Sequence, residues 1–334
     1  MTRVLPKDPE ALLDAATRGS RAALARLLSL VEAGGRPLRE VARLAYRSPP
    51  PYTVGLTGAP GAGKSTLTDR LITEARAGWP GSDGSTGPGE PVDQVAVLAV
   101  DPSSPRSGGA LLGDRVRMAE HTTDPAVYIR SMATRGHLGG LSLAVPDAVR
   151  VLGAAGLPLV LIETVGVGQM EVEVASAADT TVVVVTPGWG DAMQANKAGL
   201  LEVADVFVIN KADRPGVADS RRDLLEMLDL SARGDWRPPI VATSADRGEG
   251  VAELWAEVAG HRRFLIETGA LEARRSTRLA DELRRVLTAR LAAEVEGLGG
   301  RPDFAQAARE LAAHRLDPYE AADRLLGARP AGAG

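Results

Sequence analysis

The middle of the chain carries short apolar segments that alternate with stretches of helical periodicity. These segments are rich in Val, Ile and Leu, lack polar alternation and are followed by helical patterns. Strands of a parallel sheet have this character because helices cover both faces of such a sheet. The pattern predicts α/β architecture with strands at Thr53–Leu56, Val95–Val100, Val127–Ile129, Leu159–Ile162, Thr181–Val185, Val206–Ile209 and Ile240–Val241.

Helical periodicity alone fills both ends of the chain. From Pro9 to Tyr46 it predicts helices, with Ser20 as an N-cap and Gly34-Gly35 as a stop, before the helix-breaking Ser48-Pro49-Pro50-Pro51. After about Arg262 the sequence offers helices at Leu265–Leu291, Phe304–Ala313 and Pro318–Leu326. We therefore predict three regions: a helical region at 1–48, a sheet-containing domain at 49–262 and a helical arm at 263–334.

Composition and charge narrow the range of functions. The chain is 25% charged and 44% hydrophobic, which is typical of a folded globular protein. A net charge of −4 gives no broad cationic field, so neither nucleic acid nor a membrane surface is an expected partner. The sequence contains no cysteine, which excludes disulfides and thiolate metal sites. With no apolar leader or long apolar run, a cytoplasmic protein is expected.

A phosphate-binding loop follows the first predicted strand. The residues Gly58-Ala59-Pro60-Gly61-Ala62-Gly63-Lys64-Ser65 fit the pattern G-x-x-x-x-G-K-[ST] and open a helix that continues through Thr66 to Ala77. Glycines allow backbone N–H groups to surround phosphates, Lys64 reaches the β- and γ-phosphates, and the Ser65 hydroxyl binds Mg²⁺. In this context the motif predicts a P-loop NTPase whose domain is residues 49–262.

A second motif selects the base. Asn210-Lys211-Ala212-Asp213 directly follows the strand at Val206–Ile209, and the carboxyl ends of parallel strands are where such sheets bind ligands. The carboxylate of Asp213 can accept two N–H bonds from a guanine edge, whereas adenine would leave it unpaired. Thr243-Ser244-Ala245, after the last strand, resembles the loop that supports the base in GTPases. The motifs together predict a site for GTP and GDP.

Magnesium would be held by oxygen ligands at neighbouring strand ends. Besides Ser65, three acids are candidates: Asp101 after Val95–Val100, Glu163 after Leu159–Ile162, and Asp114 in a loop. For Asp101 and Glu163 the metal role is favoured over turn capping, whereas for Asp114 the two interpretations stay open. Gly166 and Gly168, just after Glu163, predict a flexible element near the γ-phosphate.

These residues resemble a known family, the MeaB/ArgK GTPases of the SIMIBI class. The resemblance lies in VDPSSPRSGGALLGDRVRM, ETVGVGQ, PGWGDAMQANKAGLLEVADVFVINKAD and the P-loop, which cover most of Tyr52 to Asp213. It implies a homodimeric GTPase of low intrinsic activity that acts as a chaperone of an adenosylcobalamin-dependent acyl-CoA mutase of the methylmalonyl-CoA mutase type. GTP hydrolysis would be coupled to cofactor delivery and protection of the mutase.

The resemblance also implies roles for residues outside the two nucleotide motifs. Asp101 and Asp114 would belong to switch I, Glu163 to Gln169 to switch II, and Asp191, Gln194 and Lys197 to a third switch. The predicted catalytic set is therefore Lys64, Asp114, Glu163, Gln169, Asp191 and Lys197. The chain has only four lysines among 39 basic residues, so a lysine at position 197 favours a specific role over a solvated charge.

Two other functions remain open. Nickel-inserting relatives in the same class hold metal with Cys and His, but this chain has no cysteine and four scattered histidines, which disfavours nickel delivery. A nucleotide-gated binding module without significant turnover would carry the same motifs as an enzyme.

The helices after residue 262 have apolar residues but no sheet of their own to cover. They are expected to pack against a second copy and form a two-fold dimer. A helical cap within one chain is the alternative.

Overall fold

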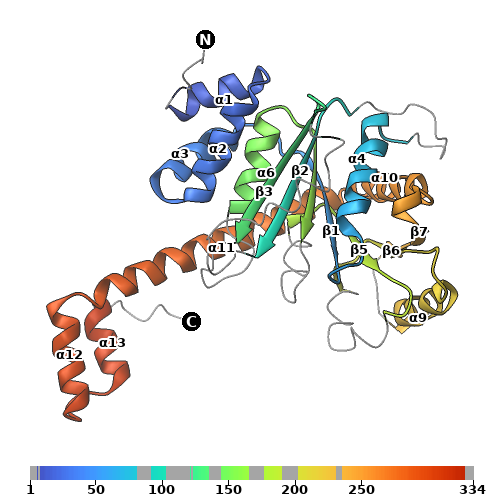
Figure 1. Ribbon diagram of the computed structural model, residues 1–334. Helices are drawn as coiled ribbons and strands as arrows, with labels where there is room; N and C mark the ends of the chain where they lie inside the picture. Colours follow the sequence, from blue (N-terminus) through green and yellow to red (C-terminus); the bar gives the residue numbers. More distant parts are fainter. Residues whose placement is uncertain are drawn as a thin grey trace. The chain divides into compact units, whose positions relative to one another are not determined.

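The computed structural model describes residues 6, 8–80, 92–102, 121, 123–134, 144–164, 177–189, 202–230 and 235–327. In this part of the chain each predicted apolar segment is a strand of one parallel sheet, which confirms the α/β prediction (Figure 1). The strands are β1 (Tyr52–Gly58), β2 (Val95–Pro102), β3 (Val127–Thr134), β4 (Leu159–Thr164), β5 (Thr180–Val185), β6 (Val206–Asn210) and β7 (Ile240–Thr243).

The order of the strands places β1 at the centre of the sheet. The order is β3-β2-β4-β1-β5-β6-β7, so β4, β2 and β3 lie on one side of β1, and β5, β6 and β7 lie on the other. In open parallel sheets, ligands bind beyond the carboxyl ends of the strands at the point where the order of the strands reverses. The carboxyl end of β1 is Gly58, the first residue of the predicted phosphate-binding loop.

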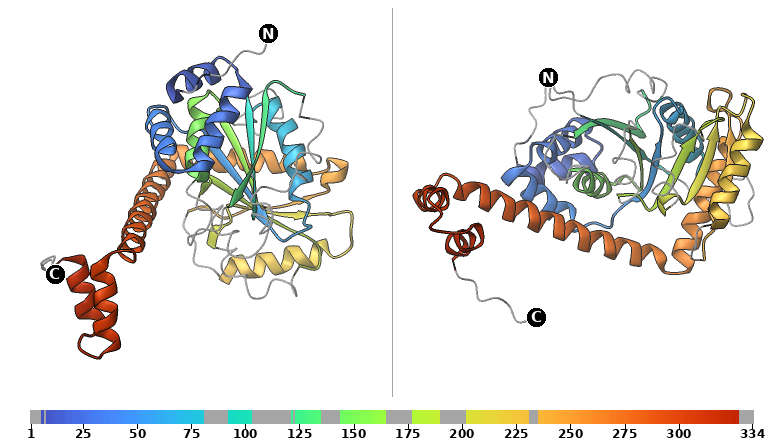
Figure 2. Two further views of the ribbon diagram at one scale, coloured as in Figure 1. Left: turned by 60° about the vertical axis from the view of Figure 1, so that its left-hand side comes forward. Right: turned by 90° about the horizontal axis from the view of Figure 1, so that it is seen from below.

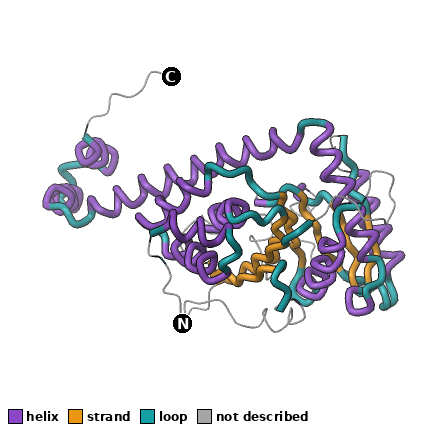
Figure 3. Tube along the Cα trace, turned by 90° about the horizontal axis from the view of Figure 1, so that it is seen from above, coloured by secondary structure: helices purple, strands orange, loops and turns teal. Residues whose placement is uncertain are grey.

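Helices cover both faces of the sheet (Figure 3). One face packs against α4 (Lys64–Ala77) and α10 (Val251–Glu267). On the other face lie α6 (Ala144–Ala154) and the N-terminal helices, of which the second and third contact α6, as Figure 2 also shows, together with α9 (Val217–Leu230) over β5–β7. The N-terminal helices are α1 (Pro9–Thr17), α2 (Arg21–Ala33) and α3 (Gly35–Ala45).

Burial on both faces explains the continuous apolar segments. Val97 and Leu98 are neighbours in β2 that point to opposite faces, and both are fully buried. Val97 belongs to the hydrophobic core between the sheet and α4 and α10, and Leu98 to the core between the sheet and α6. A strand with one face in water would carry polar residues at every second position. No helix in the described part of the chain is long and apolar enough to cross a membrane.

Two glycines in the left-handed region end helices. Gly34, at φ +72°, ends α2 as predicted, and α3 begins at the next residue. Gly269, at φ +71°, separates α10 from α11 (Ala270–Leu298), so the prediction of one helix from Leu265 to Leu291 was wrong. A glycine adopts this conformation without steric cost. Helical periodicity on both sides of Gly269 concealed the break.

The chain forms two compact units, Met1–Arg278 and Leu279–Gly334. The second unit contains the rest of α11, α12 (Pro302–Ala312) and α13 (Pro318–Leu326). Its only core cluster among the described residues joins Ala307, Leu316 and Ala321. This division into two units does not test the three regions expected from the sequence, 1–48, 49–262 and 263–334, which remain a proposal.

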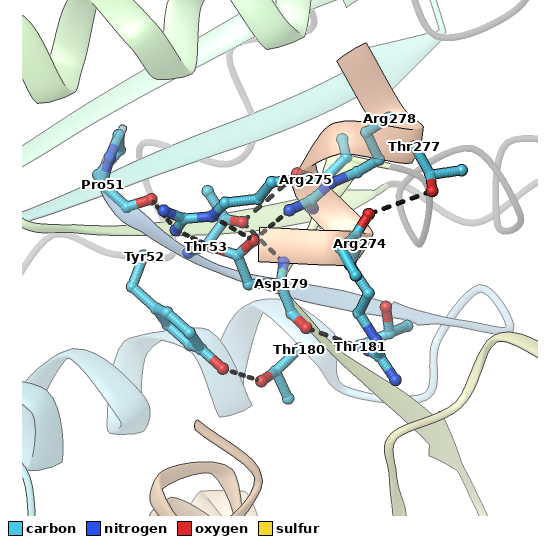
Figure 4. Close-up of polar contacts among 12 residues, drawn as sticks. Pro51, Tyr52, Thr53, Asp179, Thr180, Thr181, Arg274, Arg275, Thr277 and Arg278 are labelled. Carbon is cyan, nitrogen blue, oxygen red and sulfur yellow. Dashed lines mark hydrogen bonds and ion pairs between the residues drawn. The ribbon is translucent and has the colours of Figure 1, made fainter. Parts of the chain in front are cut away.

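A buried ionic cluster joins the start of α11 to the amino-terminal edge of the sheet (Figure 4). Arg275 donates to both carboxylate oxygens of Asp179, at 3.1 and 2.6 Å, and Arg278 also pairs with Asp179. Asp179 in turn accepts from the backbone N–H of Thr53 at 3.0 Å. Burial raises the pKa of Asp179, but Arg275 and Arg278 together hold that pKa below its usual range. The carboxylate thus stays charged and fixes α11 to β1 and β5.

His261 lies beside this cluster in a fully buried position. Its Nδ1 is 2.8 Å from Thr180 Oγ1, and its Nε2 is 3.3 Å from Asp205 Oδ1. Burial, with a smaller effect of the Arg274 guanidinium, lowers the pKa of His261 to about 3. The imidazole is therefore neutral at pH 7, and its proximity to Asp205 is not an ion pair.

The stability of the protein should consequently fall as the pH drops below about 6.5. Between that value and about 3, the unfolded chain binds a proton on His261 that the folded chain excludes. We expect the free energy of unfolding to decrease by about 1.4 kcal/mol between pH 7.5 and 5.5 on this account. Asp179 contributes only below about pH 4, where its carboxylate is protonated in the unfolded chain.

Urea titrations at pH 7.5 and 5.5 measure this effect. His261→Asn, whose side-chain oxygen replaces Nδ1 as the partner of Thr180, should lose most of the pH dependence. His314→Asn, at an exposed histidine, should retain it. An unchanged pH dependence in His261→Asn would refute the assignment.

Candidate functional site

A pocket of about 500 Å³ opens at the carboxyl edge of the sheet, around the ends of β1, β4, β6 and β7. Its lining combines the phosphate-binding loop, the predicted base motif and the predicted acid at the end of β4. The lining residues predicted from the sequence are Pro60, Gly61, Gly63, Lys64, Ser65, Thr66, Glu163, Asn210, Lys211, Asp213, Ser244 and Ala245. Residues separated by almost 200 positions in the sequence thus meet at one site.

The loop between β1 and α4 presents a cation and a helix N-terminus to the pocket. Lys64 is buried, and its Nζ donates to Gly58 O at 2.6 Å and to Ala59 O at 3.0 Å. In the described part of the chain no side chain caps the first turn of α4, whose N-cap is Gly63. The N–H groups of this turn and the positive end of the helix dipole favour an anion such as a phosphate group.

Two glycines of this loop are required by close approaches of other groups. A Cβ on Gly58 would lie 2.0 Å from Val184 O, and a Cβ on Gly63 would lie 2.4 Å from the Asn210 amide nitrogen. Gly63 also has φ +90°, which other residues rarely adopt. Gly58, Ala59 and Ala62 shape the loop without lining the pocket in the described residues.

Asn210 connects the phosphate-binding loop to the loop after β7. Its Nδ2 donates to Ala62 O at 2.8 Å, and its Oδ1 accepts from Thr243 Oγ1 and the Ala245 N–H, each at 3.1 Å. Both ends of the amide are therefore used within the protein. Asn210, the first residue of the base motif, thus connects two loops of the pocket.

Lys211 and Asp213 complete the motif at the mouth of the pocket. Lys211 has an unusual left-handed backbone, at φ +60°, and its Nζ donates to Gly61 O at 2.6 Å. Asp213 is exposed, and its Oδ1 accepts from Ser244 Oγ at 3.2 Å. The carboxylate retains acceptor capacity for N–H groups of a ligand.

Ser65 and Glu163 bring two oxygen donors together inside the pocket. Ser65 Oγ donates to Glu163 Oε1 at 2.5 Å, and both residues are buried. A hydroxyl and a carboxylate beside a phosphate-binding loop fit Mg²⁺, which takes oxygen ligands together with water and phosphate. The backbone of Asp101 lies nearby, at the end of β2, where Ala99 pairs with Glu163.

The remaining predicted residues fall outside the described structure. The side chain of Asp101 and the whole of Asp114, Gln169, Asp191, Gln194 and Lys197 lie outside the described residues. The flexible element expected at Gly166 and Gly168 and the three switch segments therefore stay predictions, as does the open choice of role for Asp114.

Two lining residues are absent from the predicted binding set: Asp246, and Thr164, which was expected only as part of switch II. Thr164, at the end of β4, donates from Oγ1 to Leu56 O at 3.4 Å, and Asp246 follows Ala245 in a short 3₁₀ turn. Both directly follow predicted site residues, Glu163 at a strand end and Ala245 in the loop that resembles the base-supporting loop of GTPases, so extending each segment by one residue would have included them. Among the described residues, no group of three His, Asp or Glu side chains is arranged to hold a metal ion.

The matching family model and two related proteins are all named as GTPases. The family model of the methylmalonyl-CoA mutase-associated GTPase MeaB matches residues 24–298. A putative GTPase of Pyrococcus abyssi is 46% identical over 320 residues, which cover 94% of this chain and 95% of that protein. A probable GTPase of Mycobacterium bovis is 42% identical over 282 residues, covering 81% of this chain and 80% of that protein.

The fold also matches a solved structure. The crystal structure of an LAO/AO transport system kinase aligns with a TM-score of 0.68 at 26% identity, covering 97% of this chain and 98% of the other. The similarity therefore spans the sheet and the helical segments that precede and follow it in the sequence.

Proposed function

The chain belongs to the MeaB family of methylmalonyl-CoA mutase-associated GTPases, and from this premise we propose that it is a GTP-hydrolysing chaperone of an adenosylcobalamin-dependent acyl-CoA mutase. GTP use would be coupled to cofactor delivery and to protection of the mutase. A cytoplasmic location agrees with the cysteine-free composition. The observation that carries the nucleotide part of this proposal is the pocket in which Lys64, Ser65, Glu163 and Asp213 converge.

Each group has a defined task in this proposal. Lys64 and the N-terminus of α4 neutralise the phosphate charge, and Asp213 accepts the N–H groups of the guanine edge. Ser65, Glu163 and Asp101 would hold Mg²⁺, which stabilises the charge that develops on the phosphate oxygens. Gln169 is the candidate for orienting or activating water. The alternative of nickel delivery gains no support from the scattered histidines.

A stimulation assay tests the mutase part of the proposal through Lys197. The parent protein should hydrolyse GTP slowly, and the cognate mutase should accelerate hydrolysis because it orders groups that stabilise transition-state charge. Lys197→Ala should lose this acceleration and keep basal turnover and GTP affinity within about twofold, since those depend on Lys64 and Asp213. GTPase rates of both proteins, with and without saturating mutase, give the answer.

Lys7→Ala is a suitable control for this assay, because it removes a lysine that belongs to no motif. Equal stimulation of the parent and Lys197→Ala would contradict the role of Lys197. Absence of stimulation in every protein would contradict this mutase as the client.

The proposal includes a homodimer formed through the C-terminal helices. Apolar side chains recur at every fourth position of α11 and are between 42% and 59% exposed: Leu279, Leu283, Leu287, Leu291 and Val295. No residue of α11, which is described in full, is buried. Among the described residues of the second unit, the core has only three buried residues, too few to stabilise a structure of this length alone. A second copy would cover the apolar positions.

Light scattering at several concentrations should therefore give the mass of a dimer. Replacing Leu283 and Leu287 together by Glu should give a monomer, since two charges would be desolvated in the interface. Leu225→Glu, at an exposed leucine of α9, is the control and should remain dimeric. A parent protein that is monomeric at every concentration, with or without GTP, would support the in-chain cap instead.

A further inference from the structure

Arg70 connects the helix that follows the phosphate-binding loop to the loop after β7. It stands on α4, six residues after Lys64 and about 9 Å farther along the helix axis. Its Nε donates to Ala245 O at 3.2 Å, and its Nη2 donates to Asp246 O at 3.4 Å. Ala245 and Asp246 both line the pocket, although Arg70 itself does not. The helix that begins at the phosphates thus also holds the loop after β7.

The contacts around Ala245 show how this loop is fixed. Its N–H donates to Asn210 Oδ1 at 3.1 Å, and its carbonyl oxygen accepts from Arg70 on the other side. Ser244, the preceding residue, donates to Asp213 Oδ1. The turn Ala245–Arg247 is only three residues long, and so short a 3₁₀ segment has little stability of its own. Within the loop, Ser244 pairs with Glu249 and the Gly248 N–H donates to Ala245 O at 3.2 Å, which keeps the shape of the loop. The bonds from Asn210 and Arg70 hold the loop against β6 and α4.

We propose that Arg70 is a positioning residue for guanine recognition, which locks the Ser244–Asp246 loop in the orientation that faces the base. The proposal rests on the GTP site proposed above. A guanidinium suits this task because its rigid fork donates to two successive carbonyl groups at once. Without it, the Asp246 carbonyl would lose its guanidinium donor and the Ala245 carbonyl would keep only the N–H of Gly248, so the loop would be held less firmly beside Asp213.

The loss should appear in base recognition and not in phosphate binding. For Arg70→Ala we expect the Kd values of GTP and GDP to rise by the same factor, about tenfold, the lower end of the effect of one hydrogen bond from a charged donor. The weak affinity for ATP should stay unchanged, so discrimination between GTP and ATP should fall about tenfold. Inorganic tripolyphosphate, which has no base, should bind as tightly as to the parent protein.

The chain supplies a matched control on the same helix. Arg76 of α4 also donates from its guanidinium to two backbone carbonyls, those of Val92 at 3.0 Å and Asp93 at 2.6 Å, which lie outside the pocket. Arg76→Ala should leave all nucleotide affinities within about twofold. Arg70→Lys keeps a cationic donor but not the fork, and should recover part of the affinity for GTP.

The test is equilibrium titration of the parent protein, Arg70→Ala, Arg70→Lys and Arg76→Ala with GTP, GDP, ATP and tripolyphosphate. Single-turnover GTP hydrolysis is measured as well, at saturating protein. There the rate of Arg70→Ala should match that of the parent within about twofold. Unchanged GTP affinity in Arg70→Ala would overturn the proposal, and so would an equal loss of tripolyphosphate affinity, which would indicate damage to the phosphate loop. A parent protein that binds ATP as tightly as GTP would contradict the GTP site itself, and the role of Arg70 would fall with it.

Discussion

Lys64→Ala is expected to weaken the binding of GTP by about a thousandfold and to abolish measurable turnover. A unit charge about 4 Å from the lysine interacts with it by about 4 kcal/mol at an effective dielectric constant of about 20, which corresponds to roughly three powers of ten in affinity. Lys64 is buried against the carbonyls of its own loop and belongs to none of the apolar clusters. Its removal should therefore affect binding far more than folding.

Fluorescent nucleotide titration and phosphate release measure this loss, and thermal unfolding checks the fold of the variant. Lys7→Ala, a lysine outside the motifs, should behave like the parent protein. GTPase kinetics in Lys64→Ala equal to those of the parent would show that this loop does not bind the phosphates.

Asp213→Asn is expected to exchange the preference for guanine for a preference for xanthine. In the proposed site the carboxylate would accept two N–H bonds from guanine. A hydrogen bond to a charged group contributes about 1.5–3 kcal/mol, so GTP should bind at least about a hundredfold more weakly to the variant. Xanthine has a carbonyl oxygen in place of the exocyclic amine, and an asparagine amide can donate to it. The Asn side chain can still accept from Ser244 Oγ, so the local structure should persist.

Competition of GTP, ATP and xanthosine triphosphate for the site distinguishes the outcomes. Asp219→Asn changes an exposed carboxylate on α9, outside the pocket, and should leave the preference for GTP intact. If Asp213→Asn binds GTP as the parent does and gains nothing for xanthosine triphosphate, Asp213 does not read the base.

Most of the strands could be predicted from the sequence because they are buried on both faces, whereas Ile129, Arg130 and Ser131 of the edge strand β3 are only half-buried. A segment such as Leu159–Ile162 contains only apolar residues, and in the structure all of β4 is buried. The break at Gly269 was missed because a single glycine within a helical pattern is compatible with a continuous helix. Only its left-handed backbone reveals the end of α10.

Contacts between distant residues were beyond the reach of sequence patterns. Arg275 and Arg278 belong to an Arg-rich helical segment that resembles a solvated surface, yet they pair with Asp179, almost 100 residues earlier in the chain. Arg70 is equally inconspicuous in the sequence and contacts carbonyls 175 and 176 positions away. A contact to a backbone carbonyl does not depend on the side chain of the residue that accepts it. The contacts that hold the Ser244–Asp246 loop are therefore seen only in the folded structure.

Single-turnover hydrolysis of GTP by the purified chain tests the central claim most directly. Mixed with excess protein and Mg²⁺, GTP should be converted to GDP and phosphate, slowly without the cognate mutase and faster with it, whereas removal of Mg²⁺ or replacement of GTP by ATP should stop the reaction. GTP that stays bound and intact under all these conditions would identify a nucleotide-gated binding module, and ATP hydrolysis at the rate of GTP would contradict the assigned base.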